Sequence, residues 1–158
     1  MKLYMKQKFF SFADKFTIWD SNGNEKYYVQ GEAISFGRRL HIFDLHGREL
    51  ALVKQEMLTL LPKFYVFKGG NQIAQIRKEF SFFTPKYTVA GLNWEVSGNF
   101  LAHEYEVSKH GRPIVSISKE WYTWGDSFQL DIADGADEIV ALAVVLAIDC
   151  VLDMQEDN

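Results

Sequence analysis

Ile139-Val-Ala-Leu-Ala-Val-Val-Leu-Ala-Ile148 is a run of ten consecutive apolar residues, and it decides the fold of this chain. The run lies inside a segment from about Asp137 to Asp153 that predicts a helix. A helix without a polar face has to be buried on every side, in protein or in lipid. A bilayer span needs about 20 apolar residues, and this run ends sooner, at Asp149. The sequence therefore predicts that the rest of the chain surrounds this helix.

Length and composition narrow the class of protein. The chain has 158 residues, a formal net charge of -4 and 15% aromatic residues. This length predicts a single domain, residues 1–158, with one substantial core. The negative charge argues against a nucleic-acid binder, and the aromatic content indicates packed strands. Because Cys150 is the one cysteine, a disulfide framework within the chain is excluded, and we expect a cytoplasmic protein without a signal peptide or transmembrane segment.

Short apolar and aromatic runs separated by turn signals fill most of the chain before the helix. This pattern is typical of consecutive antiparallel strands. It extends from about residue 7 to residue 131, and its turn signals are Ser21-Asn-Gly-Asn24, His46-Gly47, Gly69-Gly-Asn71, Gly98-Asn99 and His110-Gly111.

A repeated hairpin underlies these strands. The copy that opens at Gly47 continues to Pro62-Lys-Phe-Tyr-Val66, and the copy that opens at Gly70 continues to Pro85-Lys-Tyr-Thr-Val89 with identical gaps. A third copy opens at Gly111, and a weaker one opens at Gly23. The sequence therefore predicts four related long hairpins.

Residue parity assigns a face to each strand position, because alternate side chains point to opposite sides. We predict that the interior face carries Ala51, Val53 and Met57, then Ala74, Ile76 and Phe80, then Val115, Ile117 and Trp121. The first position of each trio is small enough to press against a central helix. The opposite face carries Glu32, Glu56, Glu79 and Glu120, which we expect to lie across each hairpin from Arg39, Lys63, Lys86 and Ser127. Such pairs help to fix register, so these charges indicate structure rather than chemistry.

The strand count agrees with the helix. Another strand pair fits between Gly91 and Lys109, and with Lys8 to Asp20 the total comes to about twelve. A closed barrel of that size has room for a helix, whereas a smaller one is filled by its own side chains. We therefore predict a mainly β fold: a closed antiparallel barrel of about twelve strands around a hydrophobic C-terminal helix, residues 137–153, capped by Asp134 or Asp137.

Several stretches carry a family resemblance: Tyr4-Met-Lys-Gln-Lys-Phe-Phe10, Asp20 to Gly23, Tyr28-Val-Gln-Gly-Glu32, Phe43-Asp-Leu45 before Gly47-Arg-Glu49, and Asp149-Cys-Val-Leu152. Through them nearly the whole chain resembles a small, bacterial-type member of the LURP-one-related family, which shares a structural superfamily with tubby C-terminal domains and phospholipid scramblases. The resemblance implies a twelve-stranded barrel threaded by a hydrophobic C-terminal helix. Tubby domains bind phosphoinositides through basic residues, but no motif here places those ligands on particular residues.

The ends of the repeated hairpins are apolar where turns are usually polar. They contain Met57-Leu-Thr-Leu-Leu61, Phe80-Ser-Phe-Phe83 and Trp121-Tyr-Thr-Trp124. On one interpretation they gather at one end of the barrel, where Leu60, Leu61, Phe82, Phe83, Tyr122 and Trp124 contact a membrane or partner, and Lys54, Lys63, Arg77, Lys78, Lys86 and Lys119 bind anionic lipid. On the other, the strands run longer and these residues belong to the core or to a dimer interface.

Catalytic and metal signatures are weak. His103-Glu-Tyr-Glu106 lacks a second zincin histidine, and we place it on a strand, whereas His41, His46 and His110 lie at or near turns. Cys150 has no activating neighbour and fits a small buried hydrophobe. Asp149 has two interpretations: it reaches solvent at the barrel mouth, or it forms a small polar site there. We predict no catalytic residue, no metal site and no cofactor.

The predicted function is accordingly a non-enzymatic binding or scaffold module. Anionic phospholipid or phosphoinositide at the inner membrane face is the ligand that the hairpin ends favour. The alternatives are a protein-interaction module that uses the same surface and, less favoured, an enzyme with a site near Asp149.

Overall fold

The computed structural model describes residues 1–6, 15–34, 37–81, 85–100, 102–122 and 125–156, and for residues 33–34, 120–122, 125–126 and 155–156 it describes the backbone alone. It contains one helix, α1 (Glu138–Glu156), and twelve strands. The strands are β1 (Lys2–Lys6), β2 (Lys15–Asp20), β3 (Glu25–Ile34), β4 (Gly37–Asp44), β5 (Glu49–Gln55), β6 (Lys63–Lys68), β7 (Asn71–Glu79), β8 (Lys86–Ala90), β9 (Trp94–Asn99), β10 (Glu104–Lys109), β11 (Arg112–Tyr122) and β12 (Gly125–Ile132).

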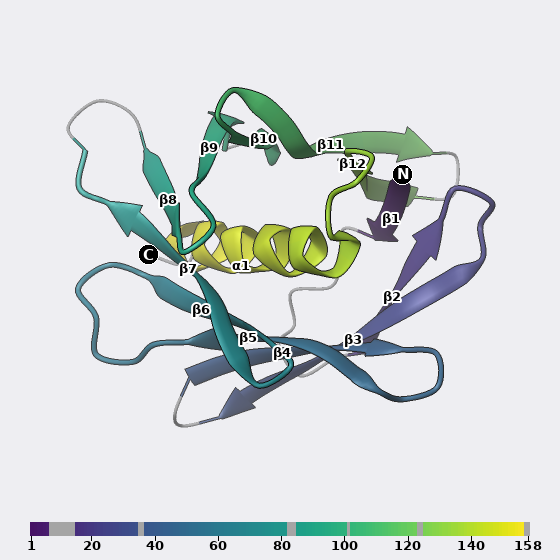
Figure 1. The fold of residues 1–158 in the computed structure, drawn as a ribbon, viewed down its shortest axis with the longest axis horizontal. Helices are drawn as coiled ribbons and strands as arrows, with labels where there is room; N and C mark the ends of the chain where they lie inside the picture. The colour runs from purple at the N-terminus through teal and green to yellow at the C-terminus, as the bar shows by residue number, and fades with distance from the viewer. Residues whose placement is uncertain (7–14, 35–36, 82–84, 101, 123–124, 157–158) are drawn as a thin grey trace.

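The twelve strands form a closed antiparallel barrel in which each strand pairs with its neighbours in the sequence and β1 pairs with β12. The predicted fold class is therefore confirmed. The first strand lies earlier than we predicted, because β1 begins at Lys2 rather than near residue 7. Figure 1 shows α1 running through the middle of the ring of strands.

The helix is enclosed along most of its length. Residues 141–151 have no exposed surface, and the helix contacts β5, β6 and β7 on one side and β11 and β12 on another. Asp137 caps its start by accepting hydrogen bonds from the amides of Ile139 and Val140, each at 3.1 Å. An ion pair between Arg38 and Asp153, 3.3 Å apart, ties its last turns to β4.

Small residues allow the helix to lie closest to one wall of the barrel. Ala51 and Ala74 are buried on β5 and β7, two of the three adjacent strands with which α1 has its most extensive contacts. The predicted interior positions Val53, Ile76, Val115 and Ile117 are also buried. Met57 and Phe80 were assigned wrongly: β5 ends at Gln55 and β7 at Glu79, so alternation no longer sets the face of residues beyond them. The side chain of Trp121 lies outside the described part.

The four repeated hairpins are β3–β4, β5–β6, β7–β8 and β11–β12. Glu32 faces Arg39, Glu79 faces Lys86 and Glu120 faces Ser127, as predicted. In the remaining hairpin, the amide of Glu56 donates to the Lys63 carbonyl at 2.9 Å, and their side chains form an ion pair at 2.8 Å. The spacing that the copies share thus corresponds to one common register.

Candidate functional site

Four apolar side chains project from the ends of two adjacent hairpins. Leu58 is fully exposed, Leu60 is 86% exposed, Phe80 is 76% exposed and Met57 is 44% exposed. We call these four residues the tip cluster. The β5–β6 loop and the end of β7, which carry them, lie on the same side of the barrel (Figure 1). The amide of Lys78 donates to the Pro62 carbonyl at 3.3 Å, which holds the two hairpins together.

The tip cluster is exposed because its residues lie beyond the paired strands. The hydrogen bond from the Glu56 amide to the Lys63 carbonyl closes the β5–β6 ladder, and the loop that follows extends past the barrel wall. Leu58 has a positive φ of 62°, an uncommon conformation for a branched residue that turns the chain. For these residues the interpretation as barrel core is wrong, whereas Leu61 is half-buried.

The three apolar hairpin ends do not form one surface. Figure 1 shows the ends of β11 and β12 on the other side of the molecule from the β5–β6 and β7–β8 loops. Phe82, Phe83 and Trp124 lie outside the described residues, and Tyr122 is described by its backbone alone. Of the six predicted contact residues, the structure therefore places Leu60 in the tip cluster and Leu61, half-buried, beside it.

The six basic residues predicted to bind lipid fall into those with an acidic partner, those without one, and one that lies away from the tip cluster. Lys63 pairs with Glu56, and the Arg77 Nε donates to Glu79 at 2.8 Å, so an acidic partner compensates each of these charges. Lys119 lies on β11, away from the tip cluster. Lys54, Lys78 and Lys86 have no ion-pair partner among the described residues.

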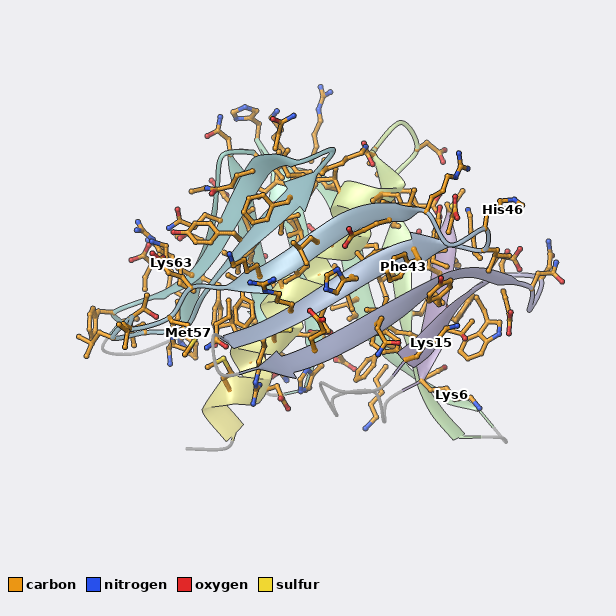
Figure 2. All side chains as sticks on the ribbon, turned by 90° about the horizontal axis from the view of Figure 1, so that it is seen from below. Lys6, Lys15, Phe43, His46, Met57 and Lys63 are labelled. Carbon is orange, nitrogen blue, oxygen red and sulfur yellow. The ribbon has the colours of Figure 1, made fainter. Side chains whose placement is uncertain are left out.

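Figure 2 shows the outer face of β3, β4 and β5, with Met57 and Lys63 at one extremity and His46 at the other. Next to Met57 this face is hollowed by a surface cavity of about 580 Å³. Its lining includes Arg39 and Lys54, which lie directly opposite each other on β4 and β5. The hairpin repeat predicts Glu32 as the partner of Arg39, but the spacing within one copy carries no signal that connects Arg39 with Lys54.

A histidine on the same face is bonded to two carboxylates. The Nε2 of His41 lies 2.9 Å from Glu32, and its Nδ1 is hydrogen-bonded to Glu49. Burial lowers the pKa of His41, but the two carboxylates outweigh it and the net pKa is raised. We expected His41 at or near a turn, but it lies within β4, opposite Gln30 and Leu52. Glu32 and Glu49 come from neighbouring strands.

Asp149 is buried inside the barrel and does not reach solvent at its mouth. It has no exposed surface, and its Oδ1 accepts a hydrogen bond from the Tyr105 hydroxyl at 2.7 Å. The Nδ1 of His103 lies 3.8 Å from the same oxygen. Burial raises the pKa of Asp149, against the opposing effects of His103 and Tyr105. His103 lies in the turn before β10 rather than on the strand.

Three further observations concern nucleophilic chemistry, metal binding and membrane spanning. Cys150 is buried, and burial raises the pKa of its thiol, which keeps it protonated and weakly nucleophilic. Across the described part of the chain, no three His, Cys, Asp or Glu side chains come together where they could hold a metal ion. Within the same residues, no helix is both long and apolar enough to span a membrane.

Comparison with known proteins relates the chain to one family. Residues 1–149 match the model of the LURP-one-related family. The chain is 36% identical over 158 residues to "Uncharacterized protein YxjI" of Bacillus subtilis (strain 168), an alignment that covers 100% of this chain and 98% of that protein. The X-ray structure of a protein from Arabidopsis thaliana has the same fold, with a TM-score of 0.62 and 15% identity over 94% of this chain and 90% of that one. The chain therefore belongs to the LURP-one-related family.

Proposed function

We propose that this protein is a non-enzymatic binding module that docks on an anionic membrane surface as a peripheral protein at its inner face. The observation that carries the proposal is the tip cluster, whose four apolar side chains project into solvent from two adjacent loops. Exposed apolar side chains gathered at one place mark an interaction site more often than scattered single ones do.

The physical basis is the transfer of these side chains from water into the boundary between headgroups and acyl chains. Full burial of a leucine or phenylalanine side chain contributes about 1.5–3 kcal/mol. Leu58, Leu60 and Phe80 are each at least 76% exposed, so most of that contribution is still available to binding. Partial insertion of these three side chains would therefore contribute a few kcal/mol, which suits reversible attachment.

Lysines beside the loops supply the preference for anionic lipid. Lys78 lies next to the hydrogen bond that joins the two hairpins, and Lys86 follows the loop that contains Phe80. Neither forms a short ion pair among the described residues. Lys86 lies opposite Glu79, but that carboxylate is held by Arg77 at 2.8 Å, which leaves both ammonium groups able to contact lipid phosphates. A basic residue near an anionic surface contributes about 1 kcal/mol at low salt.

Two alternatives use other features. A protein partner could cover the same cluster, but Leu58, Leu60 and Phe80 are each at least 76% exposed at the ends of hairpins, which suits insertion into a soft interface. An enzymatic site near Asp149 has converging polar groups in His103 and Tyr105, but the carboxyl has no exposed surface for a substrate to reach. Both facts support the membrane-binding proposal.

Vesicle co-sedimentation tests the proposal. The protein is mixed with vesicles of phosphatidylcholine alone, or of phosphatidylcholine with phosphatidylglycerol. We expect binding to the mixed vesicles, and a loss of at least about tenfold in affinity for the Leu58→Ser, Leu60→Ser double variant. Leu45→Ser is the matched control, because Leu45 is 55% exposed in the turn between β4 and β5, next to His46 at the far extremity in Figure 2.

Two results would count against the proposal. Binding that does not depend on phosphatidylglycerol would remove the role of the lysines, and equal binding by the double variant and the wild type would remove the role of the tip cluster. If the double variant instead abolished a concentration-dependent dimer, the cluster would be a protein interface.

A further inference from the structure

We propose that Arg39 and Lys54 form a binding site for a phosphate-bearing anion on the outer face of the barrel. The site lies beside the tip cluster, and Met57, a member of that cluster, also lines the cavity. It does not depend on membrane attachment, because a soluble phosphorylated compound presents the same chemistry as a lipid headgroup.

The first observation is the register of β4 and β5. Arg39 lies directly opposite Lys54, and both side chains line the same surface cavity. Like charges directly opposite each other on neighbouring strands destabilise a sheet. Arg39 also lies opposite Glu32 on β3, but the Glu32 carboxylate is hydrogen-bonded to His41 at 2.9 Å, and Glu56 is paired with Lys63. The Arg39 and Lys54 pair is an exception that a bound anion would relieve.

The second observation is an unsatisfied donor. The Nε of Arg39 is buried and has no hydrogen-bond partner within the described residues. Glu32 interacts electrostatically with Arg39, but the Glu32 carboxylate accepts its hydrogen bond from His41, at 2.9 Å, and not from Arg39. A buried donor without an acceptor is costly, and an oxyanion in the cavity would remove that cost.

The cavity has the size and the lining of a small-molecule site. Its volume of about 580 Å³ lies within the usual range for ligand pockets. Tyr65 and Phe67 supply aromatic walls, and Gln72 adds an amide. Glu56 also lines the cavity, but Lys63 and the Tyr65 hydroxyl, at 2.8 Å and 2.6 Å, already hold its carboxylate. The groups left to meet a ligand are therefore predominantly cationic.

The donor set indicates the ligand class. A guanidinium offers several N–H donors in a planar fork that matches the oxygens of a phosphate, and an ammonium on the opposite strand adds a point charge. A phosphate monoester, whose charge approaches two at neutral pH, fits this combination better than a carboxylate, which one of the two cations could neutralise alone.

Titration with inorganic phosphate tests the site, followed by NMR of the backbone amides of Gln55 and Tyr65, which line the cavity in every variant, and of the Arg39 Nε–H in the wild type. We expect a saturable shift in the wild type, and about tenfold weaker binding in Arg39→Gln and in Lys54→Gln, since each removes a charged hydrogen bond. Lys109→Gln is the control, because it removes an exposed lysine of β10 that lies outside the cavity lining. Equal binding by the wild type and both cavity variants would overturn the proposal.

Melting temperatures separate a ligand site from a structural role. Because either variant removes one of two opposed cations, we expect both to melt at or above the wild-type temperature without phosphate, and to gain less from added phosphate. A lower melting temperature in both would show that the pair stabilises the fold and would contradict the proposal.

Two further arms identify the source of the phosphate group. One uses soluble glycerol 3-phosphate, and the other uses vesicles of phosphatidylcholine with phosphatidic acid. If the phosphate group belongs to a lipid, Arg39→Gln weakens binding to these vesicles. The Leu58→Ser, Leu60→Ser variant should lose vesicle binding but keep binding of glycerol 3-phosphate, so failure of the membrane proposal and failure of this one give different results.

Discussion

Replacing Leu142 with alanine tests the role of the enclosed helix. Leu142 has no exposed surface, and neither have its neighbours from Ala141 to Ile148, so atoms of the same chain surround the side chain. A buried Leu→Ala change costs about 2–5 kcal/mol through lost burial and the cavity left behind. For a domain of this size each kcal/mol corresponds to about 2–4 °C, so we expect the melting temperature to fall by about 4–20 °C.

Replacing the same residue with aspartate should be more severe. A buried unpaired charge costs several kcal/mol on top of the lost packing, against a total stability of about 5–15 kcal/mol. We therefore expect Leu142→Asp, and likewise Leu146→Asp, to prevent folding.

Thermal unfolding followed by circular dichroism measures both effects. Leu45→Ala serves as the control, because Leu45 is 55% exposed and its truncation should change stability by less than about 0.5 kcal/mol. The reasoning would be refuted if Leu142→Ala melted within the error of this control, or if Leu142→Asp remained soluble and melted cooperatively.

Three further substitutions test individual contacts. Asp149→Asn tests the buried carboxyl, whose pKa is raised by burial. Because the folded state holds the proton more tightly than the unfolded state, wild-type stability should fall as pH rises from about 4 through that raised pKa. Parallel pH curves for Asp149→Asn and the wild type would contradict this. The pKa of His41 is also raised. The stabilisation that protonated His41 gives below its unfolded pKa of about 6.5 should therefore be lost as pH rises through the folded pKa. A stability difference between His41→Gln and the wild type that stayed constant with pH would argue against this expectation. A Cβ at Gly98, where φ is 138°, would lie 2.6 Å from the Tyr105 Cα, so Gly98→Ala should melt lower than Gly23→Ala, whose added Cβ meets nothing within 4 Å; equal melting temperatures would disprove this.

The sequence alone was sufficient for the architecture because each step depends on local pattern. A helix that is apolar on every side has to be enclosed, and the segment before it repeats one hairpin with constant spacing. That spacing predicted the residues that face each other within three hairpins, from Glu32 and Arg39 to Glu120 and Ser127. The number of strands that followed from the repeats then matched a barrel wide enough for the helix.

The hairpin ends show where local pattern stops being informative. Alternation continues through Met57 and Phe80 as though the strands went on, but the ladders end two residues before Met57 and one before Phe80. Whether an apolar residue beyond that point is buried depends on what other parts of the chain cover it. Local pattern therefore leaves core and exposed rim as alternatives for the hairpin ends. In the structure both Met57 and Phe80 are exposed.

The sequence by itself determined which residues pair within each hairpin and that the helix has to be buried, because both follow from the order of residues over short distances. The tertiary structure decided how separate hairpins meet: Arg39 comes to lie opposite Lys54 between two copies, and Tyr105 reaches Asp149 across the barrel. The physical reason is that barrel closure and strand tilt are set by all twelve strands together, so contacts between copies have no signature in the spacing within one copy.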